Sequence, residues 1–578
     1  MRKETLVTIF NSTLFLVLFN SCNSNSSSGN SEISKDPASI AKGEAIFTKN
    51  CSSCHNFKQD DIGPALGGIT TSASVNWLKN FIRDPKNIIE SGDKKAAQLL
   101  KKYKVAMPSF ATLSDNEMDN LIAFINKHGK SGRLDSTEKG KEILNPIPET
   151  IPLSNLLVGL KLLTQFPPSA NDGNLPVTGI TKLASQPNTG SLFVVDLRGK
   201  LYKIKNGKQV VYMDIAKLRP RFISEPGQAT GFGSFAFHPD FEKNGLLYTT
   251  HTESAEAGKA DFGFSDSIKV GLQWILTEWK TKHPDADTFS GIGRELLRVN
   301  MVTYSHGMQE ITFNPFSKPG ENDYGMLYIG VGDGGCTQVG YPSVLHGKEK
   351  IWGSILRIDP KGRNSENGKY GIPDDNPFVH SQNTRAVGEI YSYGFRNPHR
   401  ISWTKTGEMI ACNIGQANIE SLYLIKPGHN YGWPTREGSF VLDPYGDLNK
   451  VYPLPPNDSI YKITYPIAEY DHDDGNAISG GYGYQGTRIP LLKGKFLFGD
   501  IPTGRLFYID LTDVKQGKQA PIKEWSVSVN DTIKTLKEIC GNNRVDLRFG
   551  QDSQGELYIL TKEDGKVYKL MSATDKSY

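Results

Sequence analysis

The sequence predicts a multidomain protein in which a small all-α domain near the N-terminus is followed by an all-β six-bladed propeller. One observation is a Cys-X-X-Cys-His string at residues 51–55, which lies between segments with the periodicity of amphipathic helices. The other is a pattern of alternating apolar and aromatic residues that recurs six times after residue 150. The 578 residues include 58 glycines, about 10% against the usual ~7%, which favours the many turns of such a repeat.

The composition indicates a globular protein and argues against two other classes. Hydrophobic residues make up 37% and charged residues 22% of the chain, which excludes a polytopic membrane protein. Lys and Arg number 66 against 62 Asp and Glu, so the formal net charge is only +4. A chain that binds nucleic acid would show a clustered basic stripe, and we therefore expect no nucleic-acid partner.

The first 21 residues have the pattern of a secretory signal peptide. Two basic residues precede an apolar run at residues 6–19, which is too short to span a bilayer. Cys22 follows a small residue, which resembles a bacterial lipobox and predicts lipidation of Cys22, although an ordinary cleaved signal is the alternative. Residues 22–38, rich in Ser and Asn, predict a flexible tether. We expect an exported, periplasmic or cell-surface lipoprotein whose only membrane contact is this anchor.

The string Cys51-Ser52-Ser53-Cys54-His55 is the attachment pattern of a c-type haem. Its two thiols would bind the vinyl groups of the porphyrin, and the histidine would lie under the iron as an axial ligand. A zinc site would need a second ligand pair nearby, and no further cysteine follows for more than 200 residues. The βαβ setting of a thioredoxin motif is also absent. Haem c attachment agrees with an exported protein.

The segments around this string predict the rest of a haem domain. Residues 40–49 have the pattern of an amphipathic helix, and a Gly-Pro pair follows the string at residues 63–64. Met107 stands before a proline in a loop about fifty residues after the histidine. Ser114 and Glu117 then form a capping box at the start of a helix with an apolar face.

Residues 39–130 resemble a class I cytochrome c through these features. The resemblance implies that Met107 is the sixth iron ligand, although a lone methionine is more often a core residue. Ligation by His and Met raises the potential of a haem and leaves no open position for oxygen. We therefore expect this domain to carry electrons.

Beyond a polar linker at residues 131–150, one short string recurs. It starts with a turn Gly or Ser and continues with alternating apolar and aromatic residues. Copies lie at residues 191–195, 245–248, 325–329, 407–410, 494–498 and 555–559. The alternation of period two predicts strands, and the spacing of roughly 55–85 residues fits a propeller with long inserted loops. A pair of β-sandwiches is the alternative, but six similar strings favour a propeller over residues 151–572.

A set of short motifs is spread through the same region. They lie at residues 236–241 (AFHPDF), 305–307 (SHG), 329–335 (IGVGDGG), 370–378 (YGIPDDNPF), 394–398 (GFRNP), 430–434 (NYGWP) and 544–560. In these motifs and their order the region resembles the soluble quinoprotein glucose/sorbosone dehydrogenase family. The resemblance implies a six-bladed propeller that uses pyrroloquinoline quinone (PQQ) and calcium to oxidise a sugar.

The resemblance also implies roles for individual residues. His306 aligns with the family's catalytic base, which takes a proton from the sugar C1 hydroxyl, and an imidazole pKa near 6.5 suits this task. Arg396 aligns with an arginine beside the quinone, where a cation binds carboxylates or stabilises developing charge. Asn397 is its neighbour, and Arg544 aligns with a cofactor-binding arginine. A structural histidine and an arginine that ties two blades together remain alternatives. His238 also fits a family motif, and we interpret it as structural.

The calcium of the family implies a second set of residues. Gly415 and Gln416 align with two residues whose backbone carbonyls hold the calcium beside the cofactor. Because carbonyl ligands need no particular side chain, the sequence constrains this site weakly. Candidate supports for the metal or the fold are Asp333, Glu420 and Tyr431.

A few positions depart from the family pattern. Pro502 stands where a family lysine approaches the cofactor, and Arg505 is a candidate replacement. Asp546 stands where the family has a second arginine. The family's substrate-side glutamine corresponds to Gln228 only after a shift of one residue, so Gln228 is a candidate contact for PQQ or substrate. The loss of two cations would weaken the binding of a tricarboxylate such as PQQ.

Together the two domains favour an extracytoplasmic quinohaemoprotein dehydrogenase. We expect it to oxidise an aldose or a related alcohol or aldehyde through PQQ, to pass electrons to its own haem c, and then to a respiratory acceptor. Because the two domains are fused in one chain, the haem is at high effective concentration as an electron acceptor for the quinone. The alternative is a non-catalytic propeller that binds carbohydrate or protein and is tethered to an electron-carrier cytochrome c. Pro502 and Asp546 favour this second interpretation.

The cysteines after the haem string are expected to stay reduced. Cys336, Cys412 and Cys540 lie in or beside predicted strands, and we expect packed free thiols, although a bridge between Cys336 and Cys412 stays open. A disulfide framework is typical of short, cysteine-dense chains.

Overall fold

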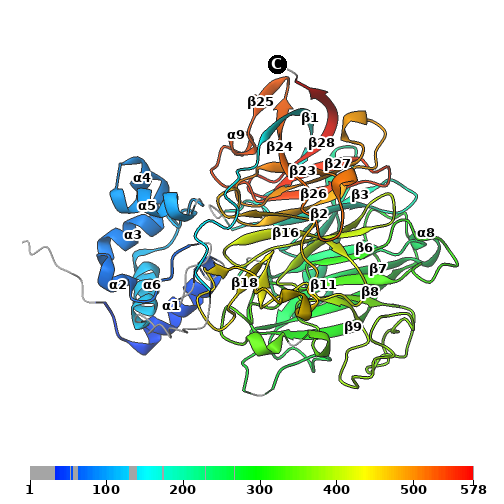
Figure 1. Cartoon of the computed structure of the whole chain (residues 1–578), viewed down its shortest axis with the longest axis horizontal. Coiled ribbons are helices and arrows are strands. Elements are labelled where there is room, and N and C mark those ends of the chain that lie inside the picture. Colours follow the sequence, from blue (N-terminus) through cyan, green and yellow to red (C-terminus); the bar gives the residue numbers. More distant parts are fainter. Residues whose placement is uncertain are drawn as a thin grey trace, which may run out of the picture.

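The computed structural model describes residues 33–51, 54–55, 57, 63–103, 105–128, 140–171, 175–227, 229–265, 267–345 and 347–576. The predicted signal segment, the lipidation site Cys22 and the candidate contact Gln228 therefore lie outside the described residues. In Figure 1 a small group of helices stands beside a much larger body of strands. In the part of the chain that the structure describes, no helix is long and apolar enough to cross a membrane.

The N-terminal domain is helical, as predicted. Its helices are α1 Pro37–Asn50, α2 Ile69–Ser72, α3 Val75–Arg83, α4 Pro85–Glu90, α5 Lys94–Tyr103 and α6 Asp115–Lys127. The two helices predicted at residues 40–49 and after Ser114 are α1 and α6. The predicted capping box is present, since Ser114 Oγ accepts from the Glu117 N–H and the Glu117 carboxylate accepts from the Ser114 N–H.

Helices α1 and α6 cross closely because residue 43 is a glycine. A Cβ atom there would lie 1.9 Å from the carbonyl oxygen of Asn120 in α6. The close approach brings Phe47 of α1 against Phe124 of α6, with 5.4 Å between ring centroids. Buried residues of α6 complete this core: Met118, Leu121, Ile122 and Ile125. The domain therefore has its own apolar interior, which the apolar face of the predicted helix anticipated.

The large domain consists of β-sheets, and three of them are four-stranded and antiparallel. One sheet contains β6 Phe232–Phe237, β7 Leu246–Ser254, β8 Leu272–Thr281 and β9 Gly291–Met301. A second contains β10 Glu310–Phe313, β11 Leu327–Val331, β12 Ser354–Ile358 and β13 Ile390–Tyr393. A third contains β14 Pro398–Trp403, β15 Met409–Asn413, β16 Ile419–Ile425 and β20 Ala468–Asp471.

The remaining long strands join into one thirteen-stranded sheet. Its first part is β21 Ile478–Gly483, β22 Lys495–Asp500, β23 Leu506–Asp510 and β24 Lys523–Val529, with β25 Thr532–Lys534 paired to β24. Its second part is β26 Leu547–Gln551, β27 Leu557–Thr561, β28 Lys566–Asp575 and β1 Leu153–Gln165. Its third part is β2 Ile180–Ser185, β3 Leu192–Asp196, β4 Lys200–Lys205 and β5 Lys208–Asp214.

Short elements lie in the loops between these strands. They are α7 Ile215–Leu218, α8 Phe241–Asn244, α9 Leu536–Cys540, β17 Arg436–Glu437, β18 Phe440–Leu442, β19 Val451–Tyr452 and five 3₁₀ turns. The turns are η1 Pro342–Val344, η2 Gly347–Glu349, η3 Asp458–Tyr461, η4 Pro490–Leu492 and η5 Leu511–Asp513. The recurring strings of the sequence are strands β3, β7, β11, β15, β22 and β27, so this prediction is confirmed.

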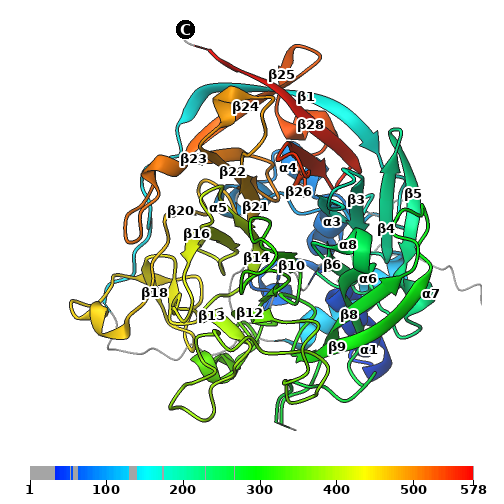
Figure 2. The same cartoon turned by 90° about the vertical axis from the view of Figure 1, so that its right-hand side faces the viewer.

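The sheets stand around a common centre, which is the arrangement of a β-propeller. The first strand of each four-strand group lies next to the first strand of its neighbours, in the closed order β2, β6, β10, β14, β21, β26 and back to β2. Figure 2 shows β10, β14 and β21 around the middle of the domain. Strand β1 closes the ring, since it pairs antiparallel with β28 and parallel with β24, so the start of the domain is bonded to its end.

A buried ion triad lies between the central strands. Glu310 of β10 forms ion pairs with Lys182 of β2 and Arg400 of β14, and all three side chains are almost fully buried. Lys182 Nζ also donates to Ser234 Oγ and to the Ile311 carbonyl. Buried charges need such pairing and added hydrogen bonds to offset the cost of their desolvation. The triad therefore fixes three sheets relative to one another.

Candidate active site

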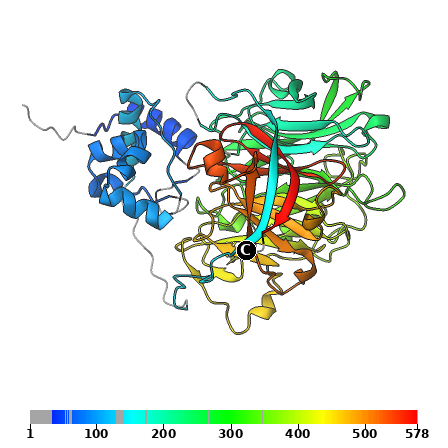
Figure 3. The same ribbon diagram turned by 90° about the horizontal axis from the view of Figure 1, so that it is seen from above.

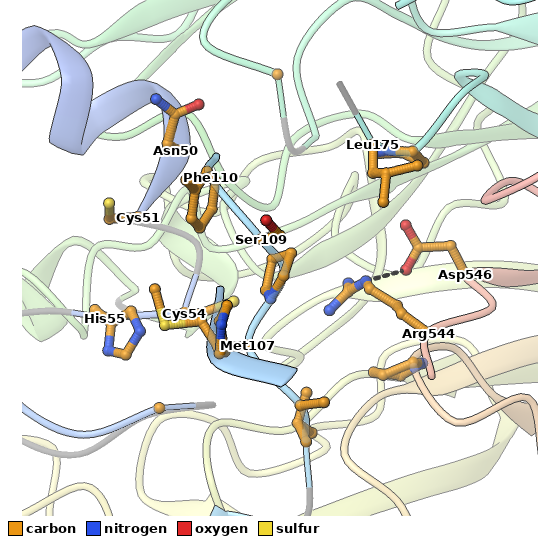
Figure 4. Close-up of a pocket in the computed structure, with 18 of the residues that line it drawn as sticks. Asn50, Cys51, Cys54, His55, Met107, Ser109, Phe110, Leu175, Arg544 and Asp546 are labelled. Carbon is orange, nitrogen blue, oxygen red and sulfur yellow. Dashed lines mark hydrogen bonds and ion pairs between the residues drawn. The ribbon is translucent and has the colours of Figure 1, made fainter. Parts of the chain in front are cut away.

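A cavity of about 1700 Å³ lies between the helical domain and one end of the propeller. Its helical wall includes Cys51, Cys54, His55 and Met107, and its propeller wall includes His306, Arg396, Asn397, Gly415, Gln416 and Arg544. Figure 3 shows the helical domain on one side of the propeller, and Figure 4 shows residues of both walls around the cavity. Pockets for one small ligand are commonly ~300–1,000 Å³. This cavity is therefore large enough for more than one ligand.

His55 is positioned in the helical wall by the loop that follows it. The ring nitrogen Nδ1 donates to the Pro64 carbonyl across 2.8 Å, which fixes a tautomer with the lone pair on Nε2. A Cβ atom at residue 63 would lie 2.3 Å from Cε1 of this ring, so only glycine permits the packing. Figure 4 shows Cys54, His55 and Met107 close together on this side of the cavity. Two thiols, an oriented imidazole and a thioether fit a covalently attached haem with His and Met ligands.

His306 lies opposite, in the loop before β10, and it is oriented by a buried carboxylate. Its Nδ1 is 2.7 Å from Asp333 Oδ1. The other carboxylate oxygen of Asp333 accepts from Trp433 Nε1 across 3.1 Å, and Oδ1 also accepts from the Gly335 N–H. The backbone of His306 has a φ of +52°, an uncommon conformation for this residue type that is often found at functional sites.

The protonation states of this pair follow from their surroundings. Burial lowers the pKa of His306, and the nearby Arg396 cation lowers it further, against the opposing effect of Asp333. Burial alone would raise the pKa of Asp333, but the charge and hydrogen bond of His306 and the charge of Arg396 bring it below its ordinary value. Asp333 is therefore ionised and His306 neutral. Because a carboxylate only accepts, His306 donates from Nδ1 and has its lone pair on Nε2.

Two glycines permit close packing around the His306–Asp333 pair. A Cβ atom at residue 307 would lie 1.8 Å from Trp274 Nε1, and one at residue 332 would lie 2.3 Å from the carbonyl oxygen of His306. These glycines explain why the Ser-His-Gly and Gly-Asp-Gly-Gly motifs occur in the sequence. Asp333, which was predicted only as a possible support, is the direct partner of the candidate base.

Arg396 and Asn397 are buried in the same wall, in the loop before β14. Arg396 Nε donates to Gln416 Oε1 across 3.0 Å, and its guanidinium lies 5.9 Å from the ring centroid of Trp433. The carbonyl of Arg396 accepts from the Asp333 N–H. Asn413 Oδ1 accepts from the N–H groups of Arg396 and Asn397. The predicted cation and the predicted base therefore belong to one hydrogen-bonded unit.

Gly415 and Gln416 line the cavity beside Arg396. Their N–H groups are bound by carboxylates, since Gly415 donates to Glu420 and Gln416 donates to Glu437 across 2.7 Å. Glu437, which no sequence motif indicated, also accepts from the N–H groups of residues 417–419. Within the described residues, no group of three or more His, Cys, Asp or Glu side chains could hold a metal ion. A calcium site here would rest on carbonyl oxygens.

Glu420 and Tyr431, the other two candidate supports, have contacts within the fold, and so does His238. The carboxylate of Glu420 is buried, which raises its pKa, and it is 3.3 Å from His472 Nε2. Tyr431 stacks on Phe395 at 4.5 Å and donates its hydroxyl to the Leu424 carbonyl. His238 is fully buried outside the cavity, where its Nδ1 accepts from the Asp240 N–H.

The end of the chain adds a charged cluster to the propeller wall. Arg544 Nε donates to Asp546 Oδ1 across 2.8 Å, and Lys562 Nζ lies 3.9 Å from Asp546 Oδ2. Burial lowers the pKa of Lys562 to about 8 and that of Arg548 to about 10, and it raises the pKa of Glu563 to about 7. Arg548 and Lys562 were not predicted. Arg548 lies within the matched segment at residues 544–560, which was the available signal, but Lys562 lies two residues beyond it.

Arg505 does not take the place of the lysine that Pro502 lacks. Its guanidinium donates to Glu524 and Asp474, and it lines a separate cavity of about 530 Å³. Pro502 itself lines the large cavity. The idea that Arg505 replaces the family cation is therefore wrong, because its two carboxylate partners lie on the other side of the loop. Arg548 and Lys562 supply positive charge to the large cavity instead.

Several buried polar atoms of the propeller wall have no hydrogen-bond partner in the described structure. They are His399 Nδ1 and Nε2, Gln416 Nε2, Arg548 Nε, Asn476 Oδ1 and Glu563 Oε2. A buried polar group left unpaired costs ~1–3 kcal/mol, so these atoms indicate a polar ligand. A flat molecule with several carboxylates, such as PQQ, fits a wall that offers Arg396, Arg548 and Lys562 together with these atoms.

The remaining cysteines are free thiols in the structure. Cys336 and Cys412 are buried, and Cys540 is half-buried at the end of α9.

The fold and the cavity define a β-propeller with a helical domain beside one end, and the two domains enclose the cavity between them. Residues 40–129 match the family model of cytochrome c, and residues 179–569 match the family model described as glucose/sorbosone dehydrogenase. The chain belongs to the glucose/sorbosone dehydrogenase family and carries an N-terminal cytochrome c domain.

Known proteins similar to this chain include enzymes and binding proteins. The human Hedgehog-interacting protein is 27% identical over 368 residues, which cover 62% of this chain and 46% of the relative. Quinoprotein glucose dehydrogenase B of Acinetobacter calcoaceticus is 26% identical over 233 residues, 38% of this chain and 43% of the relative. The chain spans about half the length of the first curated relatives that it matches. The apo crystal structure of the soluble aldose sugar dehydrogenase from Escherichia coli has a TM-score of 0.51 and 18% identity, and covers 72% of this chain and 100% of that one. This likeness shows the fold.

Proposed function

We propose that this protein is a quinohaemoprotein dehydrogenase that oxidises an aldose, or a related alcohol or aldehyde, with PQQ and passes the electrons to its own haem c. The observation that carries the proposal is the shared cavity, in which His306, oriented by Asp333 behind it, faces the same space as Cys54, His55 and Met107. A substrate oxidised at the propeller wall would be next to the electron acceptor of the same chain.

We propose six blades for the propeller. The closed order of β2, β6, β10, β14, β21 and β26 supports one blade for each inner strand. The three separate four-stranded sheets and the long composite sheet are consistent with this count.

His306 would act as the general base. A neutral imidazole that donates from Nδ1 to Asp333 can accept the hydroxyl proton of the substrate at Nε2. Asp333 stabilises the positive charge that His306 then gains, as the carboxylate does in other His–Asp pairs. PQQ supplies the two-electron acceptor for the substrate hydride when it is bound.

The cations of the propeller wall would hold the cofactor. Asn413 holds the backbone N–H groups of Arg396 and Asn397, and Gln416 accepts from Arg396 Nε, so the Arg396 side chain is oriented before a ligand binds. The family has two cations at the positions that Pro502 and Asp546 occupy here. Arg548 and Lys562 would supply the positive charge that these two positions lack. Ca²⁺ would bind through the carbonyls of Gly415 and Gln416, which is a proposal from the family resemblance.

The location and the final electron acceptor are also proposals. A signal segment before Cys22 and lipidation of that residue would place the protein outside the cytoplasm, in contact with a membrane only through the anchor. The haem would then pass its electrons to a respiratory partner. Mass spectrometry of the mature N-terminus tests the anchor, since an unmodified Cys22 or cleavage elsewhere would contradict it.

The dehydrogenase proposal is tested by loading the haem-containing full chain with PQQ and Ca²⁺ and following the haem absorbance with a panel of aldoses, alcohols and aldehydes. At least one compound should reduce the haem, and His306→Ala should abolish this reduction without changing the haem spectrum. His380→Ala is the matched control because that histidine is exposed and pairs with Asp374 on the surface. If no compound reduces the haem in the loaded protein, the proposal fails.

A second function is supported by the relatives named Hedgehog-interacting proteins. In this alternative the propeller binds a protein or carbohydrate without redox chemistry, and the exchange of two family cations for Pro502 and Asp546 reflects a lost cofactor. Calorimetric titration of the full chain with PQQ separates the two functions. Saturable binding with one PQQ per chain supports the dehydrogenase, and no binding supports the alternative.

A further inference from the structure

The Arg544–Asp546 pair points from the propeller toward the haem-attachment residues. Figure 4 shows the guanidinium of Arg544 extending from its backbone toward the side of the cavity where Cys54 and Met107 lie. Asp546 holds the base of this side chain through the bond to Nε across 2.8 Å. Asp546 itself has a φ of +52° and is 4% exposed, so the pair is anchored in the propeller wall.

The surroundings of the pair are charged and partly buried. Lys562 lies near Asp546, while Arg544 donates its backbone N–H to Asn542 Oδ1. Asn542 Nδ2 in turn donates to Glu563. Burial lowers the pKa of Arg544, but the charge of Asp546 and its hydrogen bond outweigh this effect and raise the pKa above its ordinary value. Arg544 is therefore a permanent cation on the side of the cavity that faces the helical domain.

We infer that Arg544, held by Asp546, is the cation through which the propeller raises the reduction potential of the haem in the helical domain. The inference rests on the haem c of the proposed function, and it gives Arg544 a different role from the quinone contact that the family resemblance implies. Cys51, Cys54, His55 and Met107 would hold the haem, and the charge of Arg544 would act on it from the opposite wall of the same cavity.

The direction of the effect follows from charge. One-electron reduction makes the iron centre more negative, so a nearby cation stabilises the reduced form and an anion the oxidised form. Partial burial of the pair in the propeller wall strengthens such interactions relative to water. Removing Arg544 should therefore lower the potential, whereas neutralising Asp546 should raise it.

The test is the midpoint potential of the haem, measured by spectroelectrochemistry on the haem-loaded full chain without added PQQ or sugar. Arg544→Gln should lower the equilibrium constant for reduction about threefold, which is ~28 mV at 59 mV per tenfold for one electron. Arg544→Lys should retain most of the wild-type potential. Asp546→Asn should shift the potential in the opposite direction. Because general misfolding would not shift the potential in opposite directions in the two variants, opposite signs show that the effect comes from charge.

Arg198→Gln is the matched control. Arg198 lines the same cavity, but its guanidinium is bound to Ser169 Oγ and the Pro176 carbonyl. Its loss should shift the potential less than the loss of Arg544. An unchanged potential in Arg544→Gln, or an equal shift in Arg198→Gln, overturns the inference. Because the measurement needs neither PQQ nor substrate, its outcome does not depend on whether the sugar dehydrogenase proposal holds.

Discussion

His306 Nδ1 and Asp333 Oδ1 are 2.7 Å apart, and the same carboxylate is bonded to the indole of Trp433. The contact joins two loops that are 27 residues apart in the chain. It fixes the tautomer of the histidine, with the Nδ1 proton donated to Asp333, while burial and the Arg396 cation keep the pKa of His306 low. Through the N–H of Asp333 the contact also links His306 to the backbone carbonyl of Arg396.

Replacing Asp333 with asparagine should reduce the sugar-dependent rate of haem reduction on the order of 10²–10⁴-fold. The amide can donate to Nδ1 and favour the tautomer that carries its proton on Nε2, which can no longer accept one. Stopped-flow haem absorbance measures the rate. Asp323→Asn is the control, because Asp323 binds Arg357 and Tyr328 away from the cavity. A rate within twofold of wild type would contradict the role of Asp333.

The acid limb of kcat/KM should lie below pH 6.5. The base must be neutral to accept a proton, and burial with the Arg396 cation lowers the pKa of His306, so the neutral form persists to lower pH than for an ordinary histidine. Initial rates between pH 4.5 and 8, with haem reduction as the signal, give the profile. An apparent pKa well above 6.5 on the acid side would show that another group limits the reaction.

Gly63→Ala should disrupt haem ligation. The added Cβ would stand 2.3 Å from the His55 ring, and the neighbouring loop cannot yield without losing the bond from Nδ1 to the Pro64 carbonyl. We expect a changed low-spin haem spectrum and a lower yield of haem-loaded protein. Gly92→Ala is the matched control, since no atom lies within 4 Å of its added Cβ, and its φ of +81° makes it a strained site as well. If both variants have wild-type spectra, Gly63 is not required for ligation.

Glu310→Gln should lower the free energy of unfolding of the propeller by about 3–5 kcal/mol, because it leaves Lys182 and Arg400 as uncompensated buried cations. Denaturant unfolding followed by tryptophan fluorescence measures the change. Lys217→Gln, which removes an exposed ion pair with Asp214, should change stability by less than about 0.5 kcal/mol. Equal effects of the two variants would show that the triad does not stabilise the centre.

Elements that depend on a local pattern could be predicted from the amino-acid sequence alone. Three such patterns were enough to recognise both domains and the residues that would bind haem. They are the capping box at Ser114, the period-two strings of the strands and the Cys-Ser-Ser-Cys-His string. His306 and Arg396 were found because they sit in short motifs. Each of these signals lies within a short stretch of sequence, so it can be recognised without knowing the fold.

Which residues come into contact could be seen only once the chain was folded. Asp333 is the partner of His306 because Gly332, the residue before it, has no side chain and lets the two distant loops pack backbone against backbone. Arg505 turns away from the cavity because Asp474 and Glu524 bind it, and Lys562 enters the cavity from beyond the matched segment. The placement of Arg544 toward the haem residues depends on how the helical domain stands over the propeller. Such contacts join residues up to hundreds of positions apart, and their energies depend on burial and charge that no local pattern encodes.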